Sequence, residues 1–107
     1  MTVLVQAFYR PGGAEARLPI RAAHIRHMLE WLPRTVFGGA LLDDRGDPVG
    51  MAVALDVAGR AEAEAFLADE PYARAGLFDD VRIHAMKQMT PPHTPDLLTA
   101  ELAAAAR

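Results

Sequence analysis

The spacing of apolar and polar residues divides the first half of the chain into a strand, a helix and a hairpin. Val3–Tyr9 is rich in β-branched and aromatic residues and stops at a proline-glycine cluster, which predicts a strand. Across Ile20–Trp31 apolar residues recur at helical spacing until Pro33 ends the pattern, so we expect the first helix there. Two apolar runs, Val36–Leu42 and Val49–Val57, flank a polar, turn-forming stretch and predict a β-hairpin.

The second half of the chain returns from helix to strand. Arg60–Leu67 alternates alanine with glutamate and ends in two large apolar residues, which is typical of an amphipathic helix. A proline then precedes Tyr72–Ala75, which we expect to be a short helical turn capped by Asp69 or Glu70. Val81–Met86 has the period of two expected of a strand with one packed face.

The order of these elements, β-α-β-β-α-β, predicts a ferredoxin-like α+β fold in which helices cover one face of an antiparallel sheet. We expect residues 1–90 to form this domain and residues 91–107 to form a helical tail. Within the tail, Pro95–Ala106 is rich in alanine and leucine, and Thr94 is a possible helix cap.

The second face of the predicted sheet lacks a covering layer. Apolar residues occur on both faces of the two hairpin strands, and a monomer would expose a sizeable patch of them. These residues are Val36, Leu42, Met51, Val53 and Leu55. We therefore expect a homodimer that pairs face to face.

Composition narrows the class of protein. The chain has 107 residues, of which 51% are hydrophobic and 23% charged, as in an ordinary globular domain. A net charge of -3 argues against nucleic-acid partners, which require clustered cations. Cysteine is absent, which excludes thiolate chemistry and disulfides. We find neither a secretion signal nor a membrane-spanning run of residues, and we expect a cytoplasmic protein.

The first candidate for chemistry lies on the predicted first helix. Arg21 and His24 are three residues apart, so both side chains can point into one cleft. An imidazole can accept and donate protons near neutral pH, although a lone histidine on a helix is more often a surface or interface residue. His24 and His27 have the spacing of metal ligands, but a third ligand is not evident and we predict no metal site.

The second candidate is the segment that surrounds the predicted short helical turn. A carboxylate from Asp69 or Glu70 could orient an imidazole through its ring N–H, or it could serve only as a helix cap. Phosphate-binding glycine motifs are missing, so we predict no nucleotide cofactor.

Several motifs together resemble the YciI-like family of YCII-related domains across residues 2 to 87. They are R-x-x-H ending at His24, the Gly38-Gly39 pair of the hairpin strand, E-P-Y-x-x-A-G-L-F starting at Glu70, and V-x-I starting at Val81. The resemblance implies a dimeric α+β barrel related to muconolactone isomerase-like proteins. It also implies a cleft in which a histidine and an aspartate act in acid-base chemistry.

Residue by residue, His24 matches the family histidine and Arg21 the family arginine, while Glu70 occupies the position of the family aspartate. Both Glu70 and the preceding Asp69 remain candidates for the catalytic acid. We expect Arg21 to bind an anion, and Tyr72 and Gly39 to line the pocket.

Two departures from the family pattern bear on function. The family often has Gly-Pro where this chain has Gly39-Ala40, and Gly-Ser where it has Gly50-Met51. One branch of the family resembles a dehydrochlorinase of a chlorinated hydroxyhydroquinone. The leading hypothesis is a cofactor-free lyase, isomerase or dehydrochlorinase-like enzyme for a small, partly apolar, phenolic molecule. The alternatives are a non-catalytic, dimeric ligand-binding domain and a purely structural role.

Overall fold

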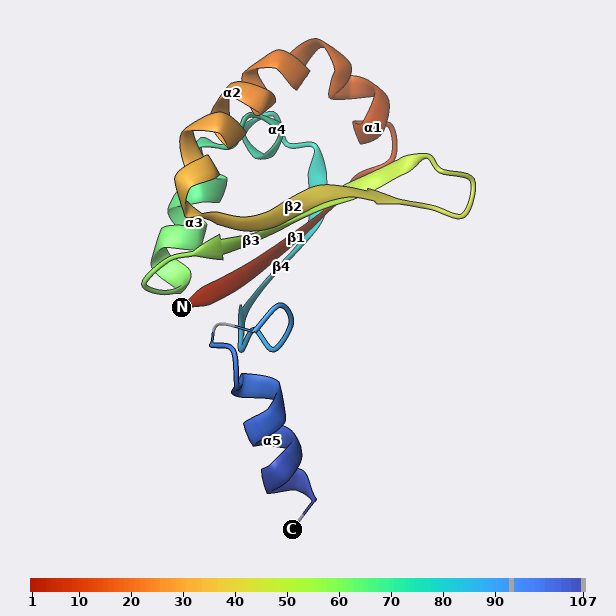
Figure 1. Ribbon diagram of the computed structural model, residues 1–107. Helices are drawn as coiled ribbons and strands as arrows, with labels where there is room; N and C mark the ends of the chain where they lie inside the picture. Colours follow the sequence, from red (N-terminus) through yellow and green to blue (C-terminus); the bar gives the residue numbers. More distant parts are fainter. Residues whose placement is uncertain (93, 107) are drawn as a thin grey trace.

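An antiparallel sheet with helices on one face forms the fold, which a computed structural model describes for residues 1–92 and 94–106 (Figure 1). The strands are β1 (Thr2–Tyr9), β2 (Thr35–Leu42), β3 (Pro48–Asp56) and β4 (Phe78–Met86). The helices are α1 (Gly13–Ala16), α2 (Arg21–Trp31), α3 (Arg60–Asp69), α4 (Pro71–Arg74) and α5 (Leu97–Ala105). Two 3₁₀ turns, η1 (Leu18–Ile20) and η2 (Leu32–Arg34), flank α2. His93 and Arg107 of the predicted tail lie outside the described residues.

The strand order β2-β3-β1-β4 confirms the predicted ferredoxin-like α+β fold. All neighbouring strands are antiparallel, and β1 occupies a central position between β3 and β4. Val3 of β1, for example, pairs with Leu55 on one side and with Ala85 on the other. Because α2 and α3 both connect strands on the same side, one face of the sheet is covered and the other is open (Figure 1).

The core lies between the covered face and the helices. Alternate residues of β1 and β3 point towards the helices, since side chains of a strand alternate between its two faces. Val5, Val53 and Leu55 are fully buried there against Phe66 of α3. Burial of one such side chain stabilises the fold by about 1.5–3 kcal/mol.

The predicted distribution of apolar residues over both faces of the hairpin was wrong for β3. The strand register places Met51, Val53 and Leu55 on the same face as the buried residues of β1, so all three belong to the core. The large apolar side chains that remain exposed on the described strands belong to the two edge strands: Val36, Phe37 and Leu42 of β2, and Val81 of β4. The open face is therefore less apolar than the sequence indicated.

Two elements start more than one residue away from the sequence-based expectation. β4 begins at Phe78 rather than Val81, because Phe78 pairs with Tyr9 across an irregularity in the β1 register. The terminal helix begins at Leu97, and the residue at its cap is Asp96 instead of Thr94. In the described region the Asp96 side chain makes no capping hydrogen bond.

The short helix α1 was not predicted at all. Gly12 has a φ of 78°, a left-handed conformation that suits glycine, and it turns the chain out of β1 directly into α1. A side chain at Gly13 would approach the Leu77 carbonyl oxygen to 2.8 Å, so the residue must be small. The breaker cluster that ends the first strand thus also begins a helix.

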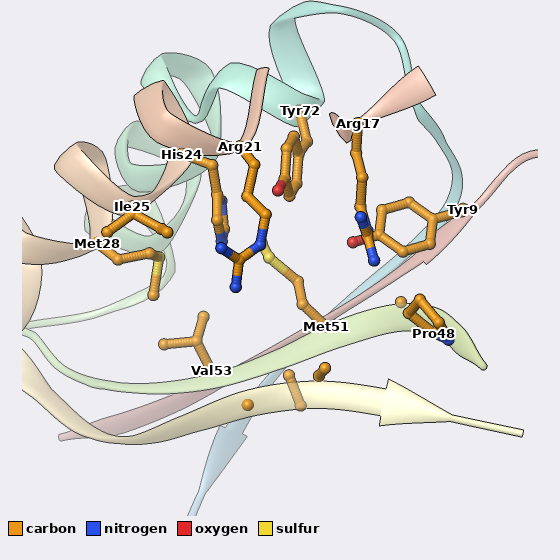
Figure 2. Close-up of a pocket in the computed structure, with 14 residues that line it drawn as sticks. Tyr9, Arg17, Arg21, His24, Ile25, Met28, Pro48, Met51, Val53 and Tyr72 are labelled. Atoms are coloured by element: carbon orange, nitrogen blue, oxygen red, sulfur yellow. The ribbon is translucent and has the colours of Figure 1, made fainter. Parts of the chain in front are cut away.

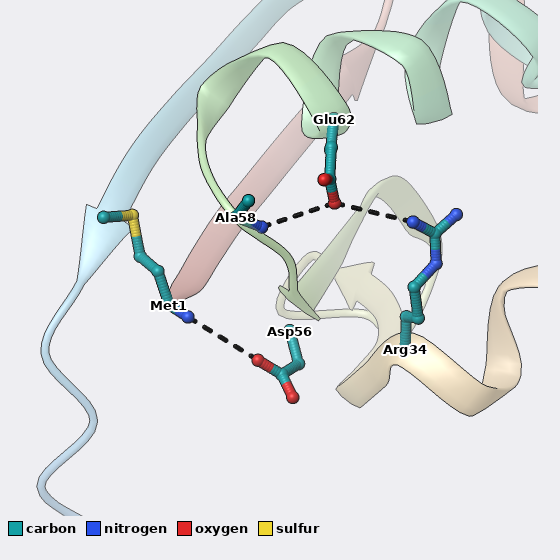
Figure 3. Close-up of polar contacts among 5 residues, drawn as sticks. All are labelled: Met1, Arg34, Asp56, Ala58 and Glu62. Atoms are coloured by element: carbon teal, nitrogen blue, oxygen red, sulfur yellow. Dashed lines mark hydrogen bonds and ion pairs between the residues drawn. The ribbon is translucent and has the colours of Figure 1, made fainter.

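Exposed polar contacts fix the end of the sheet that lies away from α1 (Figure 3). Glu62 of α3 accepts a hydrogen bond from the Ala58 backbone nitrogen at 3.3 Å, and its carboxylate lies 3.5 Å from Arg34 Nη1. The Met1 amino group lies 3.6 Å from Asp56 Oδ1. Each exposed ion pair contributes at most about 1 kcal/mol.

Helix α5 projects away from the sheet (Figure 1). An ion pair of 2.8 Å between Lys87, which follows β4, and Glu101 connects the two parts of the chain. None of the helices within residues 1–92 and 94–106 combines the length and apolar character that a bilayer crossing demands.

Candidate functional site

A cavity of about 290 Å³ lies between α2 and the β2–β3 part of the sheet (Figure 2). Ligand pockets usually measure about 300–1,000 Å³, so this cavity suits one small molecule. It is lined by Tyr9, Arg17, Arg21, His24, Ile25, Met28, Gly39, Ala40, Pro48, Gly50, Met51, Ala52, Val53 and Tyr72.

A histidine and a buried carboxylate meet at one end of this cavity. His24 Nδ1 lies 2.5 Å from Glu70 Oε1, and the Glu70 side chain is 0% exposed while that of His24 is 17% exposed. The second carboxylate oxygen of Glu70, Oε2, accepts a hydrogen bond of 2.9 Å from the Ala73 backbone N–H. Both oxygens of the carboxylate are therefore held by the protein.

The local sequence explains why Glu70 has this position. Pro71 follows it, and a residue before proline favours an extended backbone; Glu70 has φ -70° and ψ 122°. This conformation ends α3 at Asp69 and makes Glu70 the N-cap of α4. A carboxylate at a helix N-cap is favoured because it accepts an otherwise unpaired backbone N–H.

The His24 ring is also fixed from its flat side. It stacks on the ring of Tyr72 with a centroid distance of 4.1 Å and an interplanar angle of 9°. An ionised carboxylate can only accept hydrogen bonds, so Nδ1 donates to Glu70 and the Nε2 atom is left for a ligand. The arrangement holds a proton acceptor in one orientation.

The other predicted site residues are placed in different ways. Arg21 lines the cavity one turn before His24, and both side chains reach from α2 towards the sheet (Figure 2). Gly39 also lines the cavity, and because it has no side chain it contributes backbone only. A Cβ atom built on it would meet open space. Asp69 is exposed, and in the described part of the chain its carboxylate makes no hydrogen bond or ion pair with His24.

Two polar residues of the cavity were missed by the sequence analysis. Tyr9 at the end of β1 and Arg17 between α1 and η1 both line it. Burial raises the pKa of the Tyr9 hydroxyl, and the neighbouring Arg17 guanidinium offsets part of that rise. Burial likewise raises the pKa of Tyr72. Both hydroxyls are therefore protonated at neutral pH and can donate hydrogen bonds.

The second histidine of α2, His27, has a different environment. It is buried, its Nε2 atom donates a hydrogen bond of 3.0 Å to the Phe66 carbonyl oxygen, and its ring packs beside Trp31 and Phe66. His27 thus fastens α2 to α3. The described residues contain no cluster of three potential metal-ligating side chains.

Comparisons with known proteins agree with this architecture. A family model described as YCII-related domain matches residues 1–87. A search of curated proteins gave no match. A solved structure of 5-chloro-2-hydroxyhydroquinone dehydrochlorinase from Burkholderia phenoliruptrix, in complex with 2,5-dihydroxybenzoquinone, is similar to this chain with a TM-score of 0.77 and 24% sequence identity. The match covers 86% of this chain and 99% of the dehydrochlorinase.

Two further solved structures show a more distant likeness. An antibiotic biosynthesis monooxygenase matches with a TM-score of 0.50 and 18% identity over 82% of this chain and 97% of its own. A protein from Agrobacterium tumefaciens matches with a TM-score of 0.52 and 18% identity over 89% of this chain and 98% of its own. At these identities the likeness concerns the fold alone.

Proposed function

We propose, from the premise that this chain belongs to the YCII-related domain family, that it is a cofactor-free acid-base enzyme acting on a small phenolic molecule. The observation that carries the proposal is the buried Glu70 carboxylate against Nδ1 of His24, beside a cavity large enough for one ring. His24 is the general base and acid, and Glu70 orients it. Arg21 stabilises the anion that forms when the substrate loses its proton.

Each proposed role follows from the contacts. Nε2 of His24 accepts a proton from the substrate, and the resulting imidazolium is stabilised by the Glu70 carboxylate at Nδ1. Because the carboxylate is also held by the Ala73 N–H, it does not have to reorient when the charge forms. Stacking on Tyr72 keeps the ring aligned during both proton transfers.

The chemistry that fits this pair is isomerisation or elimination. In an isomerisation His24 removes a proton from one atom of the substrate and returns it to another. In a dehydrochlorination, a proton first moves from a ring hydroxyl to the chlorine-bearing carbon. A second hydroxyl then loses its proton, and its electron pair, passed through the ring, expels chloride. Neither reaction changes the net oxidation state of the substrate, so neither requires a redox cofactor.

The similar dehydrochlorinase of known structure suggests the first substrate to test. Chloride release from 5-chloro-2-hydroxyhydroquinone should be measured with the wild type and with His24→Gln. A general base contributes about 10²–10⁴-fold, so we expect His24→Gln to lose at least about 100-fold. Asp69→Asn, which changes an exposed carboxylate next to Glu70, is the matched control and should retain the rate. Equal rates for wild type and His24→Gln would refute the proposal.

The alternative function is ligand binding without turnover. Met51 lines the cavity at a position where the family often has serine, so a hydroxyl that could assist catalysis is replaced by a thioether. Saturable binding of 5-chloro-2-hydroxyhydroquinone by a protein that releases no chloride from it and exchanges none of its protons would favour this alternative.

We also propose that the chain forms a homodimer through the open face of its sheet. Phe37 of β2 is 48% exposed and pairs with Ala54 of β3 on that face, and Leu4 and Phe8 of β1 are only half-buried beside them. Sedimentation of the wild type should give the mass of two chains, and Phe37→Glu should give one. Leu29→Glu, on the exposed side of α2, is the control and should remain dimeric; a monomeric wild type would contradict the proposal.

A further inference from the structure

We propose that Arg17 and Tyr9 form an oxyanion-binding subsite at the end of the cavity opposite His24 and Glu70. Figure 2 shows Arg17 and Tyr9 on one side of the Tyr72 ring, with His24 on the other. The ligand of this site is accordingly a hydroxylated aromatic carboxylate. Its hydroxyl meets His24 and its carboxylate meets Arg17. This inference rests on the proposed function only in that both place the ligand in the same cavity.

The first observation concerns the hydrogen-bond partners of Arg17. Within residues 1–92 and 94–106, the buried Nη1 atom of its guanidinium has no acceptor. A buried donor without an acceptor is destabilising, and native proteins contain few of them. Arg17 lines the cavity, and a rotation of its guanidinium that turned this nitrogen into the cavity would present it to a ligand. A carboxylate there would supply the missing acceptor.

The second observation concerns Tyr9, whose hydroxyl lies beside the Arg17 guanidinium (Figure 2). Its ring stacks on Phe78 at 5.4 Å and meets Tyr72 edge-on at 6.2 Å, so its position is fixed by packing. Because burial keeps the hydroxyl protonated, Tyr9 supplies a neutral donor next to a cation. Such a pair can bind both oxygens of a planar anion.

The charges around the cavity favour an anion. Two guanidiniums, of Arg17 and Arg21, line it, and its lining residues include no aspartate or glutamate. The nearest carboxylate of the site, Glu70, is already held by His24 and by the Ala73 N–H. The positive charge of Arg17 is therefore not neutralised inside the cavity.

A neighbouring cavity of about 320 Å³ provides the competing arrangement. Arg17 and Pro48 line both cavities, and Glu15 and Asp47 line only the second one. In the described region neither of these carboxylates forms an ion pair with Arg17. A guanidinium that turned towards Glu15 in solution would leave the ligand cavity, and a Glu15→Gln variant tests for this arrangement.

The apolar walls identify the rest of the ligand. Ile25, Met28, Met51 and Val53 are apolar residues of the cavity lining. Figure 2 shows Met51 between His24 and Arg17, and Ile25 and Met28 on the far side of His24. An aromatic ring fits such walls by apolar and stacking contacts. A carboxylate on that ring matches the planar fork of an arginine, which is suited to bidentate recognition.

The test compares two probes that differ only in charge at one end. Binding of 4-hydroxybenzoate and of 4-hydroxybenzamide is measured by titration calorimetry with the wild type and with Arg17→Met, Arg17→Lys and Glu15→Gln. We expect the wild type to prefer the carboxylate by about tenfold or more, since hydrogen bonds between charged groups are the strong ones. Arg17→Met should abolish the preference, Arg17→Lys should keep part of it, and Glu15→Gln should keep or increase it.

Three results would overturn the subsite. They are equal affinity of the wild type for both probes, a preference that survives in Arg17→Met, and failure of both probes to bind. The outcome is separable from that of the proposed function, because the calorimetry requires no turnover. If the protein prefers the carboxylate but catalyses no reaction, the subsite is supported and the proposed catalytic function is refuted. If the protein is active but shows no such preference, the catalytic function is supported and the subsite is refuted.

Discussion

The two ends of the cavity use similar kinds of residue but treat their polar atoms differently. At one end, both oxygens of Glu70 and the Nδ1 atom of His24 have partners within the protein. At the other end, Nη1 of Arg17 has no acceptor among the described residues. Each end also carries one tyrosine, Tyr72 and Tyr9 respectively. The first end is completed by folding and the second is completed only by a ligand, so substitutions should affect stability in opposite directions.

Removal of the Glu70 carboxylate should have the largest effect. Glu70→Ala takes away the cap of α4 and leaves the His24 ring without its buried partner, which we expect to lower the free energy of unfolding by about 3 kcal/mol. Urea denaturation followed by the fluorescence of Trp31, the single tryptophan, measures the change. In Asp69→Asn the exposed neighbour should change stability by less than about 0.5 kcal/mol. Equal losses of unfolding free energy in Glu70→Ala and Asp69→Asn would show that Glu70 does not stabilise the His24 end of the cavity.

Removal of the Arg17 guanidinium should have a smaller effect of opposite sign. Arg17→Met keeps the length of the buried stem but removes the donor that lacks an acceptor. We expect the free energy of unfolding to rise by about 1 kcal/mol, because an unsatisfied buried donor costs about that much or more. The same denaturation experiment measures it. A loss of 1 kcal/mol or more would mean that Arg17 is satisfied in solution and that the contrast between the ends is wrong.

Ionisation of the tyrosines should give the smallest and most local effect. Tyr9 and Tyr72 are the only tyrosines in the chain, so the absorbance change of phenolate formation reports one residue from each end. Burial raises both pKa values above the ordinary value of about 10. Tyr72→Phe and Tyr9→Phe separate the two titrations. In Arg17→Met the pKa of Tyr9 should rise further, because the cation that favours its phenolate is gone.

The same two shifts predict how stability depends on pH. Above about pH 10 the unfolded chain loses its tyrosine protons while the folded chain still holds them. The folded state then binds more protons than the unfolded state, so the free energy of unfolding falls as pH rises through this range. Denaturation curves recorded at pH 9 and at a pH above about 10 should give a lower free energy of unfolding at the higher pH. A free energy of unfolding that rises with pH would contradict the prediction.

Much of the fold was predictable from local patterns. Val3–Tyr9 and the two apolar runs of the hairpin are rich in residues that favour strands. The turn-forming residues between the two runs indicate that they pair with each other, which restricts the possible topologies. The short helix at Pro71 was expected because a carboxylate followed by a proline at the first helical position is a strong local signal for a helix start. The family match likewise confirms the resemblance drawn from the motifs that end at His24 and begin at Glu70.

The remainder depends on contacts between distant parts of the chain. A choice between Asp69 and Glu70 required the backbone direction at the end of α3, which spacing alone does not give. Tyr9 and Arg17 come together only when β1, α1 and the helix α4 that carries Tyr72 are assembled, and an isolated arginine such as Arg17 has no local signature. The start of β4 at Phe78 was hidden by two aspartates and is determined by pairing with β1.

The double attachment of Glu70 has an evolutionary consequence. One of its oxygens belongs to the candidate reaction centre and the other to the architecture of α4. A descendant that lost its substrate would still need an acid here to keep its shape. Invariance of this position in a set of relatives would therefore not distinguish active enzymes from relatives that have lost activity. Variation at Arg17, in contrast, would follow changes of the ligand that the cavity binds.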